Sequence, residues 1–249
     1  MSEPRLAVIT PYYREPLEIL EQCHRSVITQ GVAADHFMIA DGHPLDEIDA
    51  WNVAHVKLNT AHADNGNTPR GIGSLLARSQ GYDFIAYLDA DNWYHEGHLR
   101  SLLALWEKRG GAACSSLRTF HDLAGNDLGI REPAEDDFRH VDTSCFLVHR
   151  SGFDCLTVWL DMPKILGPMC DRVFLAALLH RKLPIFSTQA RTVAFRTQYR
   201  YHYELANLPV PEDAKGNDVL QRPGEYLLSP DGVSDCIRTL GFWPFTHVR

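Results

Sequence analysis

The fold is decided by the stretch Phe84-Ile85-Ala86-Tyr87-Leu88-Asp89-Ala90-Asp91-Asn92. Its first five residues are apolar or aromatic, and they lead directly into two carboxylates one residue apart. Such a run is typical of a strand that is buried on both faces of a sheet. The carboxylates follow the end of that strand, which is where ligands bind in open α/β sheets.

Asp89 and Asp91 are close enough in sequence to repel one another, so a nearby cation is expected to offset their charge. Divalent metal ions do this well because they prefer oxygen ligands. We therefore predict a metal-dependent site for a phosphate-bearing ligand, centred on these two residues. The simpler alternative is that Asp91 or Asn92 only caps a helix expected at residues 96–109.

The composition excludes several classes of protein. The chain has 249 residues, 45% of them hydrophobic, and a net charge of −8, so it lacks the broad basic surface that nucleic-acid binding requires. No apolar run is long enough to span a membrane. The six cysteines form no C-x-x-C pair, and we expect buried thiols in a reducing cytoplasm. Peripheral contact with the inner membrane face is compatible with this expectation.

The segments before the deciding stretch alternate between strand and helix patterns, which predicts an α/β fold with a parallel, doubly wound sheet. We expect the remaining strands of this half at residues 6–10, 36–40 and 56–58, and a loop at 60–69 followed by a helix at 70–80. After the stretch, Leu99, Leu102, Leu103 and Trp106 repeat at helical spacing.

The second half of the chain is less regular. We predict strands at residues 112–117, 143–148, 185–187 and 192–195, and a helix around 173–178. Residues 118–139 are polar and acidic, which indicates a loop or flap. The tail, 206–249, carries apolar residues such as Leu227 and Trp243, so we expect it to dock on the body. The predicted single domain is thus 1–205, with halves 1–110 and 111–205, followed by this extension.

Four motifs in this order resemble those of family-2 glycosyltransferases with the GT-A fold. They are Thr10-Pro11-Tyr12-Tyr13-Arg14, Ala40-Asp41-Gly42-His43, the loop and helix start at residues 64–73, and Leu88-Asp89-Ala90-Asp91. The resemblance is good over residues 5–105 and looser over 140–200. It implies a Rossmann-like, mostly parallel central sheet flanked by helices in one domain. Ala40 departs from the usual first acid of its motif, which bears on nucleotide preference.

The resemblance also implies a nucleotide-sugar donor linked to UDP, GDP or dTDP, and Mn²⁺ or Mg²⁺ as cofactor. Asp91 matches the metal ligand, with Asp89 on the ribose side or at a metal-bound water. Asp41 matches a nucleobase acceptor, although an ordinary Asp-Gly turn is an equal alternative. Arg70 matches a phosphate-binding residue, the alternative being a solvated arginine at a helix start. The donor-binding set implied in this way is Thr10, Pro11, Tyr13, Asp41, Arg70, Asp89 and Ala90.

The general base implied by the resemblance is Asp171, at the start of the late helix. Cys170 stands where the family usually has a glutamate. The alternative for Asp171 is a carboxylate that only stabilises the helix N-terminus. His202 matches a C-terminal histidine that adds to the metal shell in some of these enzymes, whereas a lone histidine among aromatic residues is more often a packing residue.

The resulting expectation is a metal-dependent, inverting glycosyltransferase that moves a sugar to a hydroxyl group of a glycan, lipid or small molecule. Two other functions stay open. One is a non-catalytic module that binds a nucleotide or glycan. The other is a sugar nucleotidyltransferase, although residues 10–14 offer no glycine-rich loop for a triphosphate. The sequence does not indicate an oligomeric state.

Overall fold

The computed structural model describes residues 4–132, 138 and 140–247. Its centre is an eight-stranded sheet with the order β3-β2-β1-β4-β7-β6-β8-β5. The strands are β1 (Leu6–Tyr12), β2 (Asp35–Asp41), β3 (Ala54–Leu58), β4 (Phe84–Tyr87), β5 (Trp93–Tyr94), β6 (Ala113–His121), β7 (Phe146–His149) and β8 (Ile185–Arg196).

The parallel pairing predicted for the first half of the chain is confirmed. β3, β2, β1 and β4 are parallel neighbours, so their carboxyl ends meet at one edge of the sheet. Every residue of β4 is buried, as the apolar run predicts. The second half differs because β7 runs antiparallel between β4 and β6. β8 is parallel to β6, so the complete sheet is mixed but mostly parallel.

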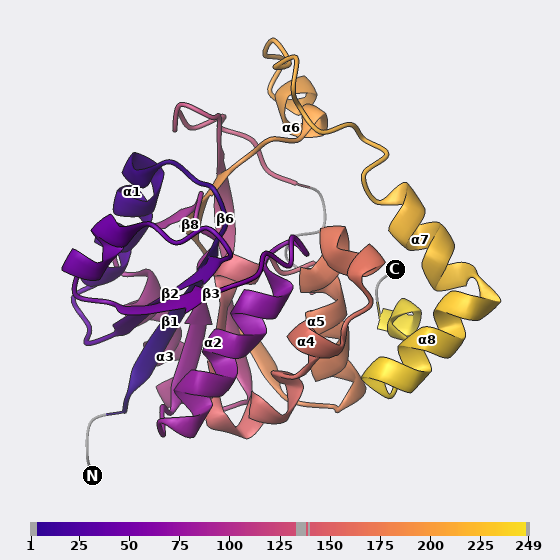
Figure 1. Ribbon diagram of the computed structural model, residues 1–249, viewed down its shortest axis with the longest axis horizontal. Coiled ribbons are helices and arrows are strands. Elements are labelled where there is room, and N and C mark those ends of the chain that lie inside the picture. Colours follow the sequence, from indigo (N-terminus) through magenta and orange to yellow (C-terminus); the bar gives the residue numbers. More distant parts are fainter. Residues whose placement is uncertain (1–3, 133–137, 139, 248–249) are drawn as a thin grey trace.

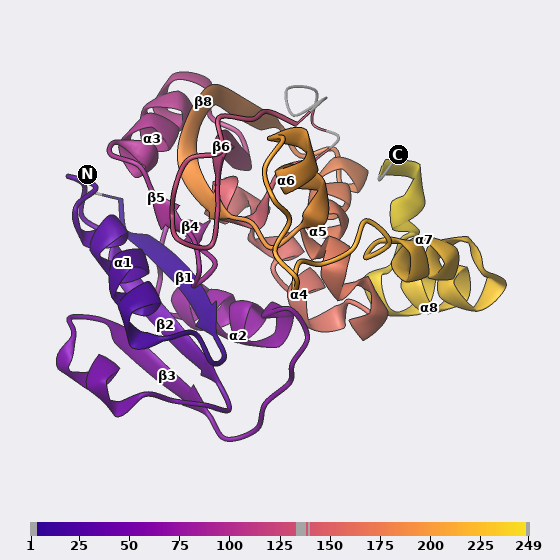
Figure 2. The ribbon, with the colours of Figure 1, turned by 90° about the horizontal axis from the view of Figure 1, so that it is seen from above.

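Helices cover both faces of the sheet (Figures 1 and 2). α1 and α3 lie on one face, and α2, α4 and α5 lie on the other. Gly73 of α2 allows a close approach to the sheet, because a Cβ there would lie 2.8 Å from Ile9 Cγ2. The helices of these two layers are α1 (Leu17–Ile28), α2 (Asn67–Ser79), α3 (His98–Arg109), α4 (Val158–Asp161) and α5 (Cys170–His180).

Three predicted elements need correction. The predicted loop 118–139 begins too early because β6 continues to His121, paired along its length with β8; residues 133–137 and 139 lie outside the described part. The two short strands predicted at 185–187 and 192–195 are one strand, interrupted only locally where Gln189 has a φ of 59°. The strand predicted at 143–148 begins as a 3-10 turn, η3 (Thr143–Cys145), and pairs only from Phe146.

The tail docks on the body through α7 (Gln221–Leu228), α8 (Pro230–Leu240) and η6 (Pro244–His247). α7 contacts η5 (Lys164–Met169), and η6 packs against α5. α6 (Arg200–Leu205) projects at the top of the view in Figure 1, above the carboxyl edge of the sheet. All six cysteines are free thiols, five of them buried, as expected. None of the described helices is long and apolar enough to cross a bilayer.

Candidate active site

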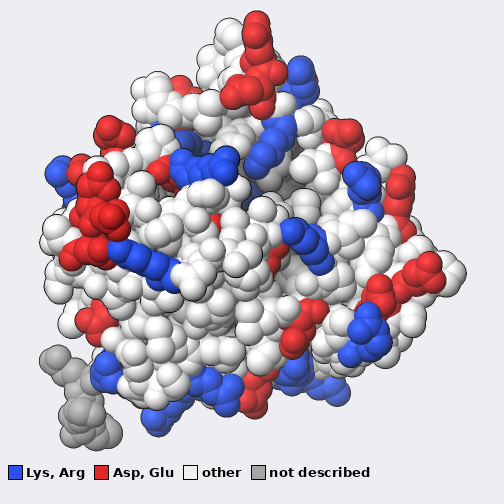
Figure 3. Space-filling model, viewed as in Figure 1, with Lys and Arg blue, Asp and Glu red and all other residues white. Residues whose placement is uncertain are grey.

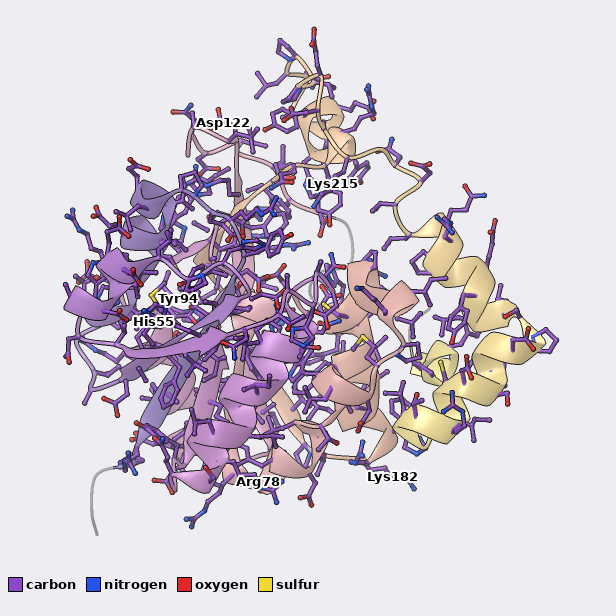
Figure 4. The ribbon with its side chains drawn as sticks, viewed as in Figure 1. His55, Arg78, Tyr94, Asp122, Lys182 and Lys215 are labelled. Atoms are coloured by element: carbon purple, nitrogen blue, oxygen red, sulfur yellow. The ribbon has the colours of Figure 1, made fainter. Side chains whose placement is uncertain are left out.

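A cavity of about 780 Å³ opens beside the carboxyl ends of β1, β2 and β4. In Figure 3 the face of the molecule is hollowed below α6, and Lys and Arg side chains border the hollow. Figure 4 places Lys215 beneath α6, between that helix and the body. Nine of the ten residues predicted for the site line this cavity: Pro11, Tyr13, Asp41, Arg70, Asp89, Ala90, Asp91, Asp171 and His202.

Thr10 is the exception among the predicted residues. Its side chain is fully buried and does not line the cavity. The hydroxyl lies 2.8 Å from His36 Nε2, and the His36 ring in turn contacts His24. Thr10 therefore ties β1 to β2 and supports the site from below, because its only polar atom is already engaged inside the protein.

Arg70 and Asp89 form an ion pair on the floor of the cavity. Arg70 Nη2 donates to Asp89 Oδ1 over 2.6 Å, while Nη1 donates to Asn67 Oδ1 over 3.0 Å. The guanidinium is almost fully buried and lies 4.8 Å from the centre of the Trp159 ring. Burial alone would lower the pKa of Arg70, but Asp89 raises it overall, so the charge is retained. The alternative of a solvated arginine at the helix start is thus wrong.

The Asp91 carboxylate faces the cavity without a cationic partner among the described residues. Burial, the charge of Asp89 and the charge of Glu15 together raise the pKa of Asp91 to about 7. Lys215 offsets only a small part of this effect. The two acids therefore differ in their surroundings. Asp89 is paired with Arg70, whereas the negative charge of Asp91 is not balanced by a cationic partner among the described residues.

The capping alternative for the acidic motif is also wrong. Helix α3 begins at His98, and its N-cap is Gly97, without a side-chain hydrogen bond. Asn92 instead is buried and joins two elements of the site, because it accepts from the Arg196 amide over 2.9 Å and donates to Ser144 Oγ over 3.2 Å. Ser144 Oγ also accepts from the Asp89 amide. These bonds fix the backbone that presents both acids.

Asp41 organises the loop that borders the cavity beside the end of β2. Its Oδ1 accepts from the amide and the ring Nδ1 of His62, each over 2.9 Å, and Oδ2 accepts from the Ala63 amide over 2.9 Å. Burial would raise the pKa of Asp41, but these hydrogen bonds lower it. The carboxylate is therefore ionised, and three of its acceptor positions are already engaged by the protein.

Tyr13 is held at the cavity rim by its neighbours. Its amide donates to Glu15 Oε2 over 2.7 Å, and its ring makes an edge contact with His43 at 4.7 Å between centres. The Arg14 guanidinium lies 5.0 Å from the same ring. An aromatic ring braced in this way is a suitable surface for a planar base or a sugar.

Asp171 lies in the first turn of α5, as predicted, and lines the part of the cavity that is formed by the second half of the chain. Its Oδ2 accepts from His140 Nε2 over 2.6 Å, and its Oδ1 accepts from the Arg172 amide over 2.7 Å. Burial would raise the pKa of Asp171, but His140 is the main cause that lowers it overall. If Asp171 only stabilised the helix N-terminus, its contact with the Arg172 amide would be expected, and this contact is present. The contact with His140 is an additional one that this role does not require.

A network of buried charges, which the sequence did not reveal, extends from Asp171 along the cavity wall. Arg118 donates to Asp142 Oδ2 over 2.5 Å and to Glu132 Oε2 over 2.7 Å. Glu132 also contacts His202 Nε2 over 2.8 Å through its other oxygen. The ion pairs are buried and linked to one another only because the folded chain brings these residues together, so the sequence alone does not show them. The sequence offered one signal, Arg118 directly after the strand predicted at residues 112–117.

His202 is engaged by this network on both sides of its ring. Nε2 contacts Glu132, and Nδ1 lies 2.6 Å from Thr197 Oγ1. No ring nitrogen is left to bind a metal in this arrangement. The geometry therefore does not support the predicted role of His202 as a metal ligand, although it lines the same cavity as Asp91.

Comparisons with known proteins agree with this architecture. The family model described as "Glycosyl transferase family 2" matches residues 7–132, just over half of the chain. The fold is similar to crystal structures of S. aureus TarS. The 1–349 fragment in complex with UDP has a TM-score of 0.58 and 11% identity, over 95% of this chain and 70% of that one. The fragment in complex with UDP-GlcNAc has a TM-score of 0.57 and 12% identity, over 95% and 71%.

A longer TarS structure gives a TM-score of 0.58 at 13% identity, and the match covers 98% of this chain and 49% of that one. A search of curated protein sequences finds no significant match. The family model spans β2, α2 and β4, the elements that present Asp41, Arg70, Asp89 and Asp91. This chain therefore belongs to glycosyl transferase family 2 and is a glycosyltransferase with a GT-A fold.

Proposed function

We propose that this enzyme is metal-dependent and inverting, and that it transfers a sugar from a nucleoside-diphosphate donor to a hydroxyl group. The observation that carries the proposal is the different state of the two neighbouring acids. Asp89 is paired with Arg70, whereas Asp91 faces the cavity without a cation among the described residues. A negatively charged donor diphosphate requires positive charge at that position, and a metal ion held by Asp91 would supply it.

The residues present fit a divalent cation. The raised pKa of Asp91 results from burial and from the charges of Asp89 and Glu15, and a bound cation would offset both of these charges. Within the described part of the chain, no three acids, histidines or cysteines form a metal cluster. Mg²⁺ and Mn²⁺ suit such a site, because one or two carboxylates suffice when phosphate oxygens and water supply the other ligands.

When bound, the cation would stabilise the charge that develops on the departing diphosphate. The protein's own groups do the rest. Arg70 keeps Asp89 in place beside the metal position, and the braced Tyr13 ring offers a surface for the nucleoside. The loop fixed by Asp41 closes the donor end of the cavity.

Asp171 supplies the base in this proposal. The acceptor hydroxyl oxygen attacks the anomeric carbon, its proton passes to the Asp171 carboxylate, and the bond from that carbon to the diphosphate oxygen breaks. One displacement inverts the configuration at the anomeric carbon. The position of Asp171 in the cavity wall and its ionised state support this assignment. The acceptor class is the hydroxyl of a glycan, lipid or small molecule.

The UDP and UDP-GlcNAc in the TarS structures support a UDP-linked donor, with GDP and dTDP sugars as the other members of the class. We also infer a cytoplasmic location, which the six free thiols support.

The test is a panel of UDP-, GDP- and dTDP-sugars, measured with and without Mn²⁺. We expect one nucleotide class to raise the melting temperature only with metal, because a ligand of the folded state stabilises it. We also expect slow release of the nucleoside diphosphate, with water as acceptor. Binding without any release or transfer would instead indicate a non-catalytic module. Formation of a nucleotide-sugar from a nucleoside triphosphate would indicate a nucleotidyltransferase.

A further inference from the structure

We infer that His140 is a positioning residue for the base, holding the Asp171 carboxylate in one orientation between the acceptor and the buried network. This inference rests on the proposed function of Asp171. Its basis is the contact of 2.6 Å between His140 Nε2 and Asp171 Oδ2, on the wall of the catalytic cavity.

The geometry gives the two residues different roles. Both ring nitrogens of His140 are directed at carboxylates, because Nδ1 lies 3.8 Å from Glu132 Oε2. Nε2 is thus hydrogen-bonded to Asp171, and Nδ1 faces the Glu132 carboxylate at ion-pair distance. Asp171 keeps acceptor capacity on Oδ1, which among the described residues receives the Arg172 amide alone. The proton accordingly passes to Asp171, and His140 acts through it.

Glu132 fixes His140 in turn. The Glu132 carboxylate is held by Arg118 over 2.7 Å and by His202 over 2.8 Å, so it cannot turn away from His140. Arg118 is anchored at its other end by Asp142. The side chains of His140, Glu132 and Asp171 are each about one-fifth exposed or less, which keeps solvent from loosening the chain of contacts.

Charges on four sides decide the protonation state of this pair. His140 faces Asp171 and Glu132, which favour its charged form, and Arg118, which opposes it; the pKa of His140 is raised overall, despite burial. Asp171 faces His140, Arg172 and Arg118, and it also lies close enough to Asp142 to raise the pKa of that acid. A charged imidazole is the state that donates to Asp171 and is also attracted by the charge of Glu132.

This arrangement makes a prediction about kinetics. Removing the side chain in His140→Ala leaves Asp171 present but free to rotate, so we expect kcat to fall about ten- to hundredfold with an unchanged KM for the nucleotide-sugar. His140→Gln keeps a donor near Asp171 and should recover most of this loss. The acidic limb of the pH–rate profile should move to higher pH in His140→Ala, because the pKa of Asp171 rises without its cationic partner.

The experiment measures nucleoside-diphosphate release from the panel donor that the wild-type enzyme turns over, for His140→Ala, His140→Gln and Asp171→Asn. His149→Gln on β7 is a matched control outside the cavity. A His140→Ala enzyme with wild-type kcat and pH profile, beside an inactive Asp171→Asn enzyme, would overturn the positioning role alone. An active Asp171→Asn enzyme would instead reject the proposed base.

A measurement without substrate guards against variants that fold poorly. In a histidine side-chain NMR titration of the wild-type protein, the signal lost in His140→Gln identifies His140. We expect it to stay protonated to higher pH than a free imidazole, and to lose its proton at lower pH in Asp171→Asn. An identical titration in both proteins would show that the two groups are not coupled, and would contradict the inference.

Discussion

Arg70 and Asp89 form an ion pair with 2.6 Å between Nη2 and Oδ1. This pair gives Asp89 and Asp91, which look equivalent in the sequence, different electrostatic surroundings. One acid is taken up by the protein, and the other, Asp91, is left facing the cavity. The pair also links the first turn of α2 to the end of β4, so the loop before α2 is held against the acidic motif.

We expect Arg70→Met to lower the free energy of unfolding by about 2 kcal/mol, because Asp89 would lose its partner in a largely buried place. Asp89 keeps some contact with water, which makes the cost smaller than for a fully buried pair. Urea denaturation measures the change. In a double-mutant cycle with Asp89→Asn, the second substitution should cost little once Arg70 is absent. Additive effects would mean that the ion pair contributes nothing.

Arg70→Lys is the sharper variant for function. A lysine ammonium cannot span Asn67 and Asp89 as the planar guanidinium does, so we expect weaker nucleotide-sugar binding with only a minor loss of stability. Calorimetric titration of the panel donor compares the two proteins. Equal affinity would show that the position of Asp89 does not depend on the shape of its partner.

Two helical glycines offer a matched test of packing. Gly73→Ala would place a Cβ 2.8 Å from Ile9 Cγ2 and 3.0 Å from Ile39 Cγ1, and we expect a loss of about 1–3 kcal/mol in the free energy of unfolding. Gly224→Ala, in α7, meets nothing within 4 Å and should be neutral or stabilising by up to about 1 kcal/mol. Chemical denaturation decides, and equal effects would contradict the close packing of α2 on the sheet.

The buried His98 should make stability sensitive to acid. Burial lowers its pKa to about 3, while the unfolded chain binds a proton near pH 6.5. Between these values the unfolded state holds more protons, so the free energy of unfolding decreases by about 1.4 kcal/mol for each pH unit lost. His36 adds a similar slope, since its pKa is also lowered to about 3.

The variant His98→Gln isolates this contribution. Its free energy of unfolding should depend on pH less steeply than that of the wild type, by about 1.4 kcal/mol per unit between pH 4.5 and 6. Urea denaturation at several pH values gives both slopes. Parallel curves would show that His98 is not neutral in the folded protein.

The sequence was most informative where local pattern and tertiary position coincide. The apolar run that forms β4 is short and bounded by polar residues, which favours a buried strand, and the acids after it then lie at its carboxyl end. The helix that carries Asp171 was predictable as well, because its apolar residues repeat at helical spacing. The antiparallel insertion of β7 was not, because strand direction depends on long-range pairing that a short apolar segment does not encode.

Side-chain partners were the least predictable feature. Thr10 belongs to a motif that pointed to the donor, yet its hydroxyl is directed into the protein toward His36. Glu132 and His140 lie in a polar segment without periodicity, and nothing in that segment indicated that Glu132 would pair with both Arg118 and His140. The path of the chain between these residues decides their contacts, and residue composition alone does not reveal that path.

The central claim is that Asp91 makes donor binding depend on a metal ion. Its direct test is calorimetric titration of the panel nucleotide-sugar into the wild-type protein, Asp91→Asn and Asp154→Asn, each with and without Mn²⁺. Asp154 is a matched control because its side chain is 83% exposed and lies outside the cavity. The account predicts that Mn²⁺ strengthens binding to the wild type and to Asp154→Asn, and has no effect on Asp91→Asn. An equal Mn²⁺-dependent gain in Asp91→Asn would contradict it.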